Sequence, residues 1–303
     1  MNSENAPLVS VVMITYNHEK FIQQAIEGVL MQEYIGQIEL IIANDHSPDD
    51  TDAIINKIIK EHHHGSWIKY TNHTTNIGMM ANFIWALEQA NGKYIALCEG
   101  DDYWTDPLKL QKQVDFLESN NEYVLSYTKS MELFQDNENF INTIYPQKLG
   151  ELDFQKLLSE GWFIRTATIV FVKNQLDFSF MQGLEYSADY FLQILLINKG
   201  KFHFLNETTS VYRRHPGGIS NSTAGLYLER QVLFCKNLKL FNEYTNFKYN
   251  KIILDNIKKI EINMLDFAVL NFKFKYMYLV RKRNFICIIK HFKKRIEKKF
   301  FKI

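Results

Sequence analysis

The sequence contains few residues of the kinds that define fibrous, disordered or disulfide-linked proteins. Its 303 residues include only 5 prolines and 13 glycines, which excludes a collagen-like repeat and argues against a low-complexity chain. The three cysteines, Cys98, Cys235 and Cys287, are far apart, so they form neither a disulfide framework nor a CxxC metal pair. We therefore expect a globular protein from a reducing compartment.

Long apolar runs are also missing. No stretch of about 18 uncharged apolar residues occurs, so the sequence predicts no transmembrane helix. The first ten residues, MNSENAPLVS, have neither the basic start nor the apolar stretch of a secretion signal. Both absences predict a cytoplasmic location.

Positive charge is scarce before residue 273 and abundant after it. From Lys273 onward there are twelve Lys or Arg and one acid, Glu297, which gives this tail a net charge of +11. Phe292, Ile296 and Phe300 fall on one face of a predicted helix in the tail, a pattern typical of helices that bind anionic membrane surfaces. A basic helix packed on its own domain is the alternative. The tail has no zinc-ligand pattern or readout module, so we expect no nucleic-acid partner.

Strands and helices alternate over the first 120 residues. Apolar patterns predict strands at 9–14, 38–43, 67–71 and 93–98, and helices at 19–32, 47–62, 79–90 and 107–118. This alternation indicates βαβ units, hence an α/β fold with a mainly parallel sheet that helices cover on both faces. Beyond it we expect a loop or a small excursion at 129–151, a strand at 166–173, a helix from Asp189 to Asn198, and helices after Asn221.

The segment CEGDDYW places Asp101 and Asp102 directly after a predicted strand. One carboxylate can coordinate a hard divalent cation, Mg²⁺ or Mn²⁺, while the other accepts hydrogen bonds from ribose hydroxyls. Such a dipeptide can equally begin a turn. Tyr16, Asn17 and Asp45 follow two other predicted strands, and ligands of parallel sheets bind beyond the carboxyl ends of the strands. Three strand ends therefore predict one site.

Motifs over residues 9–220 resemble those of the family 2 glycosyltransferases in order and spacing. They lie in SVVMITYNHEKFIQQAIEGVLMQ, ELIIANDHSPDDT, TNIGMMANFIWALEQANGKYIALCEGDDYWTDPLKLQKQVDFLE and VYRRHPGGIS. The resemblance implies a GT-A fold and transfer of a sugar, with inversion, from a nucleotide-diphosphate donor such as a UDP-sugar to a hydroxyl acceptor. It also implies Mn²⁺ or Mg²⁺ as cofactor and a lipid-linked or glycan acceptor in bacterial surface polysaccharide or lipopolysaccharide synthesis.

The resemblance assigns roles to individual residues. The implied donor-binding residues are Tyr16 (stacking on the base), Asn17, Asp45 (hydrogen-bonding the base), Asn76, Gly78, Asp101, Arg213 and Arg214. The implied metal ligands are Asp102 as the main one, Asp101 and His215. Asp189 is the implied general base, with Glu185 as its nearest substitute, and Trp104 and Arg165 are further acceptor-site candidates.

Three positions depart from the family pattern. Asn44 and His46 replace an acid and a glycine, and Ala188 replaces a glutamate, so a catalytically inactive nucleotide-sugar-binding or scaffold protein is the competing hypothesis. Elsewhere, the run His62–His64 lacks the usual spacing of metal ligands, and we expect it to face solvent. We divide the chain into a catalytic domain, 1–222 (donor half about 7–128, acceptor half about 129–222), and a basic helical extension, 223–303.

Overall fold

The computed structural model describes residues 6–136, 138–142, 152–218 and 224–270. The chain divides into two compact units, Met1–Gly218 and Ile219–Ile303. Each unit is considered by itself. The predicted apolar face of Phe292, Ile296 and Phe300 lies outside the described residues.

Strands and helices alternate at the start of the first unit, as the sequence predicts. In chain order this unit contains β1 (Val9–Thr15), α1 (Ile22–Leu30), β2 (Ile38–Asn44), α2 (Thr51–Glu61), β3 (Ile68–Asn72), α3 (Met79–Gln89), β4 (Tyr94–Leu97), β5 (Tyr103–Trp104), α4 (Lys109–Ser119), β6 (Tyr123–Phe134), β7 (Asn139–Asn142), α5 (Phe154–Glu160), β8 (Val170–Val172), α6 (Phe178–Met181), α7 (Ala188–Ile197) and β9 (Lys201–Arg214). The predicted order is confirmed for β1 to β4 and α1 to α4, although α2 begins at Thr51 rather than near residue 47. The elements not predicted from the sequence are β5, β6, β7, α5, α6 and β9.

The first four strands form the parallel part of a nine-stranded sheet. Their order is β3-β2-β1-β4, and every neighbouring pair is parallel. Val9 pairs with Ile38 on one side and with Tyr94 on the other, so β1 lies between β2 and β4. β1 and β2 are buried along nearly their whole length, as expected of strands that helices cover on both faces. The predicted α/β fold class is confirmed.

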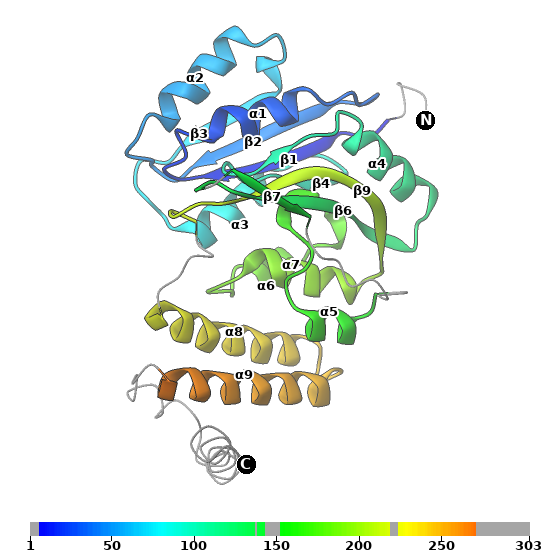
Figure 1. Ribbon diagram of the computed structural model, residues 1–303. Coiled ribbons are helices and arrows are strands. Elements are labelled where there is room, and N and C mark those ends of the chain that lie inside the picture. Colours follow the sequence, from blue (N-terminus) through cyan, green and yellow to red (C-terminus); the bar gives the residue numbers. More distant parts are fainter. Residues whose placement is uncertain (1–5, 137, 143–151, 219–223, 271–303) are drawn as a thin grey trace. The chain divides into compact units, whose positions relative to one another are not determined.

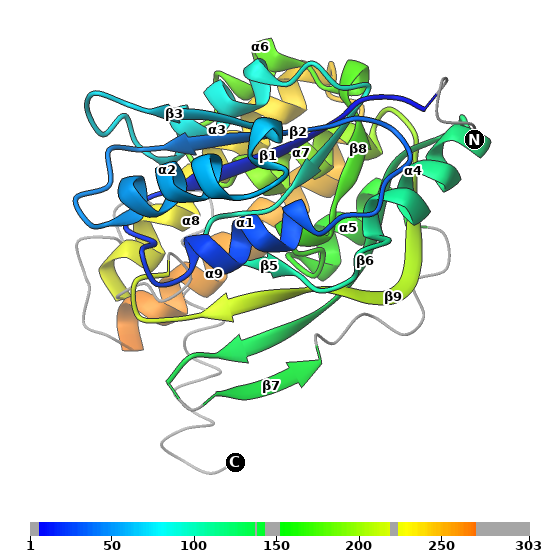
Figure 2. The same ribbon diagram turned by 90° about the horizontal axis from the view of Figure 1, so that it is seen from above.

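The strands β5 to β9 form the mixed part of the sheet. The order continues from β4 through β8, β6 and β9 to β5, and β7 pairs with β6 at the margin (Figure 2). β8 is antiparallel to β4 and β6, whereas β6 is parallel to β9. The register of β6 and β9 shifts between Thr128 and Ser130, and such irregularities bend the strands that contain them.

The loop predicted for 129–151 is wrong over its described part. β6 continues to Phe134, and β7 follows at 139–142. Polar residues such as Lys129 and Glu132 conceal this strand in the sequence. Its backbone partners come from β9, far along the chain, and such long-range pairing overrides local strand preference.

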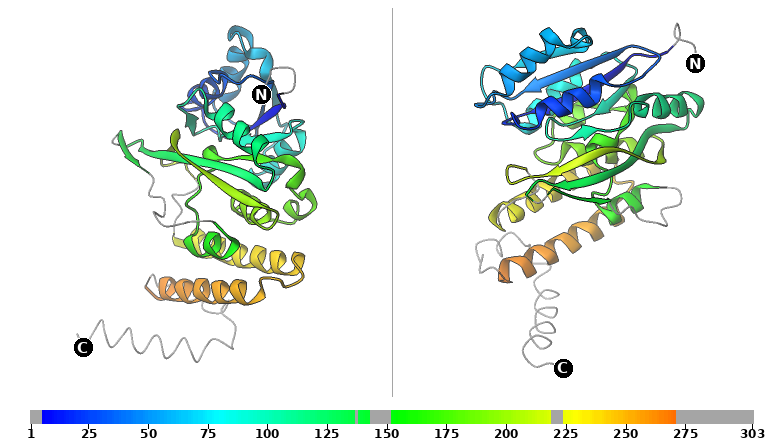
Figure 3. Two further views of the ribbon diagram at one scale, coloured as in Figure 1. Left: turned by 90° about the vertical axis from the view of Figure 1, so that its right-hand side faces the viewer. Right: turned by 45° about the horizontal axis from the view of Figure 1, so that its top comes forward.

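Helices cover both faces of the sheet (Figures 1 and 3). α1, α2 and α4 lie over one face, and α3, α6 and α7 lie over the other. A buried core cluster joins α1 and α4 to the parallel part of the sheet through Val11, Ile26, Leu40, Leu110 and Val114. Burying each such side chain contributes about 1.5–3 kcal/mol of free energy. This packing holds the strands in place, and with them the strand ends that the polar residues follow.

The described part of the second unit contains two long helices, α8 (Ala224–Tyr244) and α9 (Asn250–Leu270). Leu228 and Met264 are buried between them, and the rings of Tyr227 and Phe267 pack 4.6 Å apart. The described part of the predicted extension is therefore helical. Among the helices that the structure describes, none combines the length and apolarity needed to cross a membrane.

Candidate active site

The carboxyl ends of β1 and β4 lie side by side at the point where the strand order reverses. From β1 the chain continues to β2 on one side of the sheet and reaches β4 on the other. Ligands of open α/β sheets bind beyond the strand ends at such a switch point. A ligand site is therefore expected at the segments that follow these two strands, 16–19 and 98–102.

The turn between β1 and α1 is held by the segment that precedes α2. The backbone N–H of Asn17 donates to Ser47 Oγ at 2.9 Å. The backbone N–H of His18 donates to Thr51 Oγ1 at 3.0 Å. Asn17 has a φ of 60°, a conformation that Asn adopts more readily than most residues. The sequence SPDDT thus fixes the turn that carries His18.

Gly100 allows the segment after β4 to approach this turn. A Cβ atom at residue 100 would lie 2.7 Å from Thr15 Oγ1 and 3.0 Å from His18 Nδ1, so a side chain does not fit. Thr15 Oγ1 and His18 Nδ1 are 3.2 Å apart, within hydrogen-bond distance. The other ring nitrogen, His18 Nε2, lies 3.8 Å from Asp101 Oδ2.

A short antiparallel pair joins the acidic segment to the end of β9. Tyr103 pairs with Val211, which brings the acidic residues beside the last residues of β9. The backbone N–H of Arg213 donates to Asp102 Oδ1 at 2.9 Å. Its Nη1 donates to the main-chain oxygen of Asp101 at 2.7 Å. The mixed part of the sheet thus positions the acids that follow the parallel part.

Three side chains from distant parts of the chain meet at this point. His215 Nε2 lies 3.1 Å from Asp101 Oδ2, and potential ligand atoms of His18, Asp101 and His215 all lie within 4.8 Å of one another. The ring of Phe21 packs 4.6 Å from the ring of His215. Imidazole nitrogens and a carboxylate oxygen suit a divalent transition metal. The residues present therefore fit a divalent cation.

The two adjacent aspartates differ in electrostatic surroundings. Burial raises the pKa of Asp101, but the hydrogen bond from His215 and the charges of His18 and His215 outweigh burial and hold that pKa below its usual range. Burial, followed by the charge of Asp101, raises the pKa of Asp102 well above its usual range. Asp101 is thus the aspartate that its neighbours keep ionised.

Asp189 lies in the first turn of α7, where the helix dipole favours a carboxylate. Burial nevertheless raises its pKa, while a hydrogen bond from Thr166 and the charge of Arg165 lower it. Burial, followed by the charges of neighbours that include Asp189, raises the pKa of Glu99 well above its usual range. Asp189 therefore shares the electrostatic environment of the acidic segment, and a carboxylate with a raised pKa suits a general base.

Comparison with known protein families identifies the family of this chain. Residues 10–177, more than half of the chain, match the family described as glycosyl transferase family 2. The chain belongs to this family.

Two relatives illustrate how far the similarity extends. An uncharacterized protein of Mycobacterium tuberculosis is 35% identical over 214 residues, which cover 71% of this chain and 61% of the relative. The chain thus spans about three fifths of that relative's length. The Escherichia coli protein named UDP-Glc:alpha-D-GlcNAc-diphosphoundecaprenol beta-1,3-glucosyltransferase WfaP is 30% identical over 218 residues, 70% of this chain and 80% of WfaP.

Solved structures share the fold. Staphylococcus aureus TarS 1-349 in complex with UDP-GlcNAc has a TM-score of 0.58 at 15% identity, covering 86% of this chain and 81% of the TarS chain. Mannosyltransferase PcManGT from Pyrobaculum calidifontis, in complex with GDP-Man and Mn²⁺, has a TM-score of 0.55 at 14% identity, covering 100% of this chain and 90% of the other. The GT-A fold expected from the sequence is confirmed.

Two residues predicted to contact metal or donor, Asp102 and Arg213, are buried and contact each other. Asp102, predicted as the main metal ligand, is 1% exposed, accepts from the Arg213 amide, and is not in the His18–Asp101–His215 cluster. The buried guanidinium of Arg213 stacks on the rings of Phe21 and Tyr103. Asp102 Oδ2 is buried without a hydrogen-bond partner among the described residues, so the metal-ligand role of Asp102 stays a prediction, as does the phosphate contact of Arg213.

Two further predicted site residues are buried. Trp104 is 2% exposed, and its Nε1 donates to the main-chain oxygen of Ala167 at 2.8 Å. Its contact with an acceptor stays a prediction. Asp45 is buried and accepts from the N–H groups of Ile77 at 2.7 Å and Gly78 at 3.0 Å. Asp45 therefore holds the loop before α3, and its contact with the donor base stays a prediction.

Other predicted donor residues remain at the surface beyond the strand ends. Tyr16 is 47% exposed directly after β1, and Asn17 follows it. Asn76 is exposed, and its Oδ1 accepts from the N–H of Gly78 at 3.1 Å. Gly78 has a φ of 87°, which favours glycine there. Their contact with a donor stays a prediction.

The predicted basic residues are ion-paired. Arg214 Nε donates to Glu132 Oε2 at 2.6 Å, and Arg165 pairs with the same carboxylate. Two guanidinium groups on one carboxylate leave a net positive charge near Asp189, which fits an anionic substrate group. Glu185, the substitute base, lies exposed before α7.

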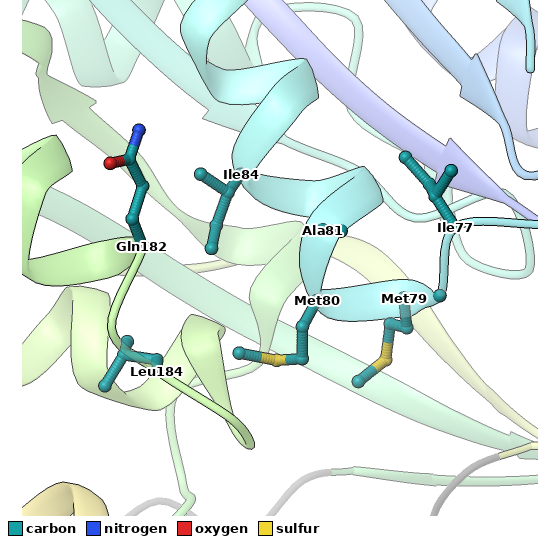
Figure 4. A pocket seen from close by; sticks show the side chains of 8 residues that line it. Ile77, Met79, Met80, Ala81, Ile84, Gln182 and Leu184 are labelled. Atoms are coloured by element: carbon teal, nitrogen blue, oxygen red, sulfur yellow. The ribbon is translucent and has the colours of Figure 1, made fainter.

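A separate hollow borders the start of α3 (Figure 4). It has a volume of about 360 Å³ and is lined by Ile77, Gly78, Met79, Met80, Ala81, Ile84, Gln182 and Leu184. None of its lining residues belongs to the His18–Asp101–His215 cluster, so the hollow is not the metal-binding position.

The structure explains two departures from the family pattern. Asn44 Oδ1 accepts from the N–H and the Oγ of Ser47, and Asn44 Nδ2 donates to the hydroxyl of Tyr70. This role needs an amide rather than a charge. His46 has a φ of 59°, a conformation in which a glycine is unstrained.

Sequence analysis missed His18 and Glu99. His18 stands two residues after Tyr16 in the same turn, so its position beyond β1 was the available signal. Glu99 precedes Gly100 in the acidic segment, where the adjacent aspartates are the stronger signal.

Proposed function

We propose that this chain is an active, inverting glycosyltransferase that moves a sugar from a UDP-sugar to a hydroxyl of a lipid-linked sugar or glycan. The convergence of Asp101 and His215 at the switch point, with Asp189 in the same electrostatic environment, carries the proposal. UDP is supported by TarS, which was solved with UDP-GlcNAc. The lipid-linked acceptor, and a role in bacterial surface polysaccharide or lipopolysaccharide synthesis, are supported by the name of WfaP.

Each residue has a defined part in the proposed reaction. Asp101 and His215 hold Mn²⁺ or Mg²⁺, which, when bound, offsets the charge of the departing nucleoside diphosphate. Tyr16 stacks on the nucleotide base, and Arg214 attracts phosphate oxygens. Asp189 takes the proton of the acceptor hydroxyl. At the same time the hydroxyl oxygen bonds to the anomeric carbon, and the bond from that carbon to the diphosphate breaks. One such in-line displacement inverts the anomeric centre.

The basic tail would bring the enzyme to a lipid-linked acceptor. Its net charge of +11 after residue 272 favours the anionic inner face of the plasma membrane. We expect the full chain to sediment with anionic vesicles at low salt, and to bind neutral vesicles or DNA less. Equal binding to DNA and anionic vesicles would contradict a membrane-directed tail.

A panel of nucleotide sugars tests the function directly. With Mn²⁺ or Mg²⁺ we expect slow release of nucleoside diphosphate from one donor, faster release with a matching acceptor, and loss of both after chelation. A folded protein that binds a nucleotide sugar and never cleaves it would instead support the inactive binding protein, which the departures at Asn44 and Ala188 favour.

A further inference from the structure

The geometry points to His18 as a third protein ligand of the metal in the proposed glycosyltransferase site. The inference rests on that proposed function, because it assumes a divalent cation at Asp101 and His215. It adds a residue from the β1–α1 turn to the metal site. It also predicts which cation the site prefers.

The position of His18 is built by several independent contacts. The Thr51 hydroxyl accepts from its backbone N–H, and the Thr15 hydroxyl lies 3.2 Å from its Nδ1. The absence of a side chain at Gly100 makes room for the ring. Metal-bound histidines commonly use the second ring nitrogen in such a hydrogen bond, which sets the ring orientation.

The other ring nitrogen of His18, Nε2, lies near the two ligands already proposed. His18 Nε2 lies 3.8 Å from Asp101 Oδ2, and His215 Nε2 lies 3.1 Å from the same oxygen. The three potential ligand atoms lie within 4.8 Å of one another, a separation that small side-chain movements around one ion can close.

The donor set has a consequence for metal choice. Two imidazole nitrogens and one carboxylate oxygen suit Mn²⁺, Co²⁺ and related ions, whose affinity for nitrogen rises along the series. Mg²⁺ prefers oxygen ligands and keeps its waters. With His18 as a ligand, the site therefore discriminates against Mg²⁺ more strongly than Asp101 and His215 do alone.

The alternative is that His18 binds no metal and only places its Nε2 near the Asp101 carboxylate, 3.8 Å from Oδ2. His18→Gln separates the two roles, because a glutamine amide keeps an N–H donor but is a poor metal ligand. His203→Gln is a matched control. His203 Nδ1 lies 3.2 Å from the Ser126 hydroxyl, the same kind of contact that His18 makes with Thr15. Among the described residues, His203 belongs to no cluster of potential metal ligands.

The experiment measures metal affinity in the absence of a sugar donor. Electron paramagnetic resonance of free Mn²⁺ gives the Mn²⁺ affinity, and competition of Co²⁺ or Mg²⁺ against bound Mn²⁺ gives the other two. All proteins carry His62→Gln and His63→Gln, because the rings of His62–His64 form a second potential metal cluster. Circular dichroism and thermal unfolding verify that each variant is folded.

We expect His18→Gln to weaken Mn²⁺ binding by about 10-fold or more, Co²⁺ binding by a larger factor and Mg²⁺ binding by less than about 3-fold. His203→Gln should change none of them. Unchanged Mn²⁺ affinity, an equal loss for all three metals, or the same graded loss in His203→Gln would overturn the inference. Asp101→Asn tests the proposed function separately: if it retains Mn²⁺ binding, the metal site itself is misplaced, whatever His18 does.

Discussion

The parallel and mixed parts of the sheet contribute to the site in different ways. The parallel part supplies His18 and Asp101 from segments that follow β1 and β4 and are held by nearby hydroxyl and backbone groups. The mixed part supplies His215, which reaches Asp101 across 114 residues of sequence because β5 pairs with β9. One side of the site thus depends on local turn chemistry, and the other depends on long-range strand pairing.

The largest expected effect concerns Asp189, which belongs to α7 beside the mixed part. Asp189→Asn should lower turnover by about 10²–10⁴-fold with little change in donor affinity, because a general base acts on the chemical step. Burial raises the pKa of Asp189, so turnover of the wild type should fall on the acid side at a higher pH than an ordinary aspartate would produce. Steady-state kinetics across pH measure both effects.

Stability provides the control for this variant. A carboxyl whose pKa is higher in the folded than in the unfolded state binds more protons when folded, so its contribution to stability falls as pH rises through that window. Asn removes this penalty. The free energy of unfolding of Asp189→Asn at neutral pH should therefore equal or exceed that of the wild type, and near-normal turnover in a folded variant would refute the base assignment.

The second prediction separates the neighbouring aspartates. Asp101→Asn removes the carboxylate shared by both histidines, and turnover should fall by about 10³-fold, since a bound cation contributes several kcal/mol. Asp102→Asn keeps the oxygen that accepts from the Arg213 amide, so turnover should fall by less than about 10-fold. Transfer assays at saturating Mn²⁺ measure both variants, and equal losses would return the ligand role to Asp102.

The third prediction concerns the close approach between β1 and the acidic segment. Gly100→Ala puts a Cβ atom 2.7 Å from Thr15 Oγ1, so we expect a loss of about 1–3 kcal/mol in unfolding free energy. Displacement of the acidic segment should also lower turnover by about 10²-fold. Gly217→Ala is the control, because its new Cβ would lie at least 3.4 Å from His215 and meet only ordinary contacts. Denaturant unfolding should show no comparable loss for the control.

The sequence predicts the parallel part of the sheet better than the mixed part. The parallel part was predicted within a few residues, because each βαβ unit contains its own hydrophobic pattern and turn signals. β6 was missed, because Lys129 and Glu132 interrupt its apolar pattern and its partner β9 lies far away in sequence. Asp101 and His215 were identified from motifs. Which of two adjacent aspartates faces the site, and whether Arg213 is buried, depends on three-dimensional contacts that no motif contains.

The smallest expected effect concerns Ser47, which anchors the turn within the parallel part. Its Oγ accepts from the Asn17 N–H at 2.9 Å and donates to Asn44 Oδ1 at 2.6 Å. Ser47→Ala should cost about 0.5–1.5 kcal/mol of stability and lower turnover a few-fold, because the turn that carries His18 loosens without losing any catalytic group. Ser179→Ala is the matched control, because Ser179 Oγ donates to Asp177 Oδ1 at the same distance of 2.6 Å, outside the site.

Thermal unfolding and transfer assays on the two serine variants compare the loss of the same kind of hydrogen bond inside and outside the site. A similar stability loss in both, with lower turnover only for Ser47→Ala, would locate the effect in the β1–α1 turn. Equal turnover in both variants would mean that the remaining hydrogen bond from the His18 N–H to Thr51 is enough to hold the turn. In that case the mixed part of the sheet, through β9 and His215, determines the site more than the turn does.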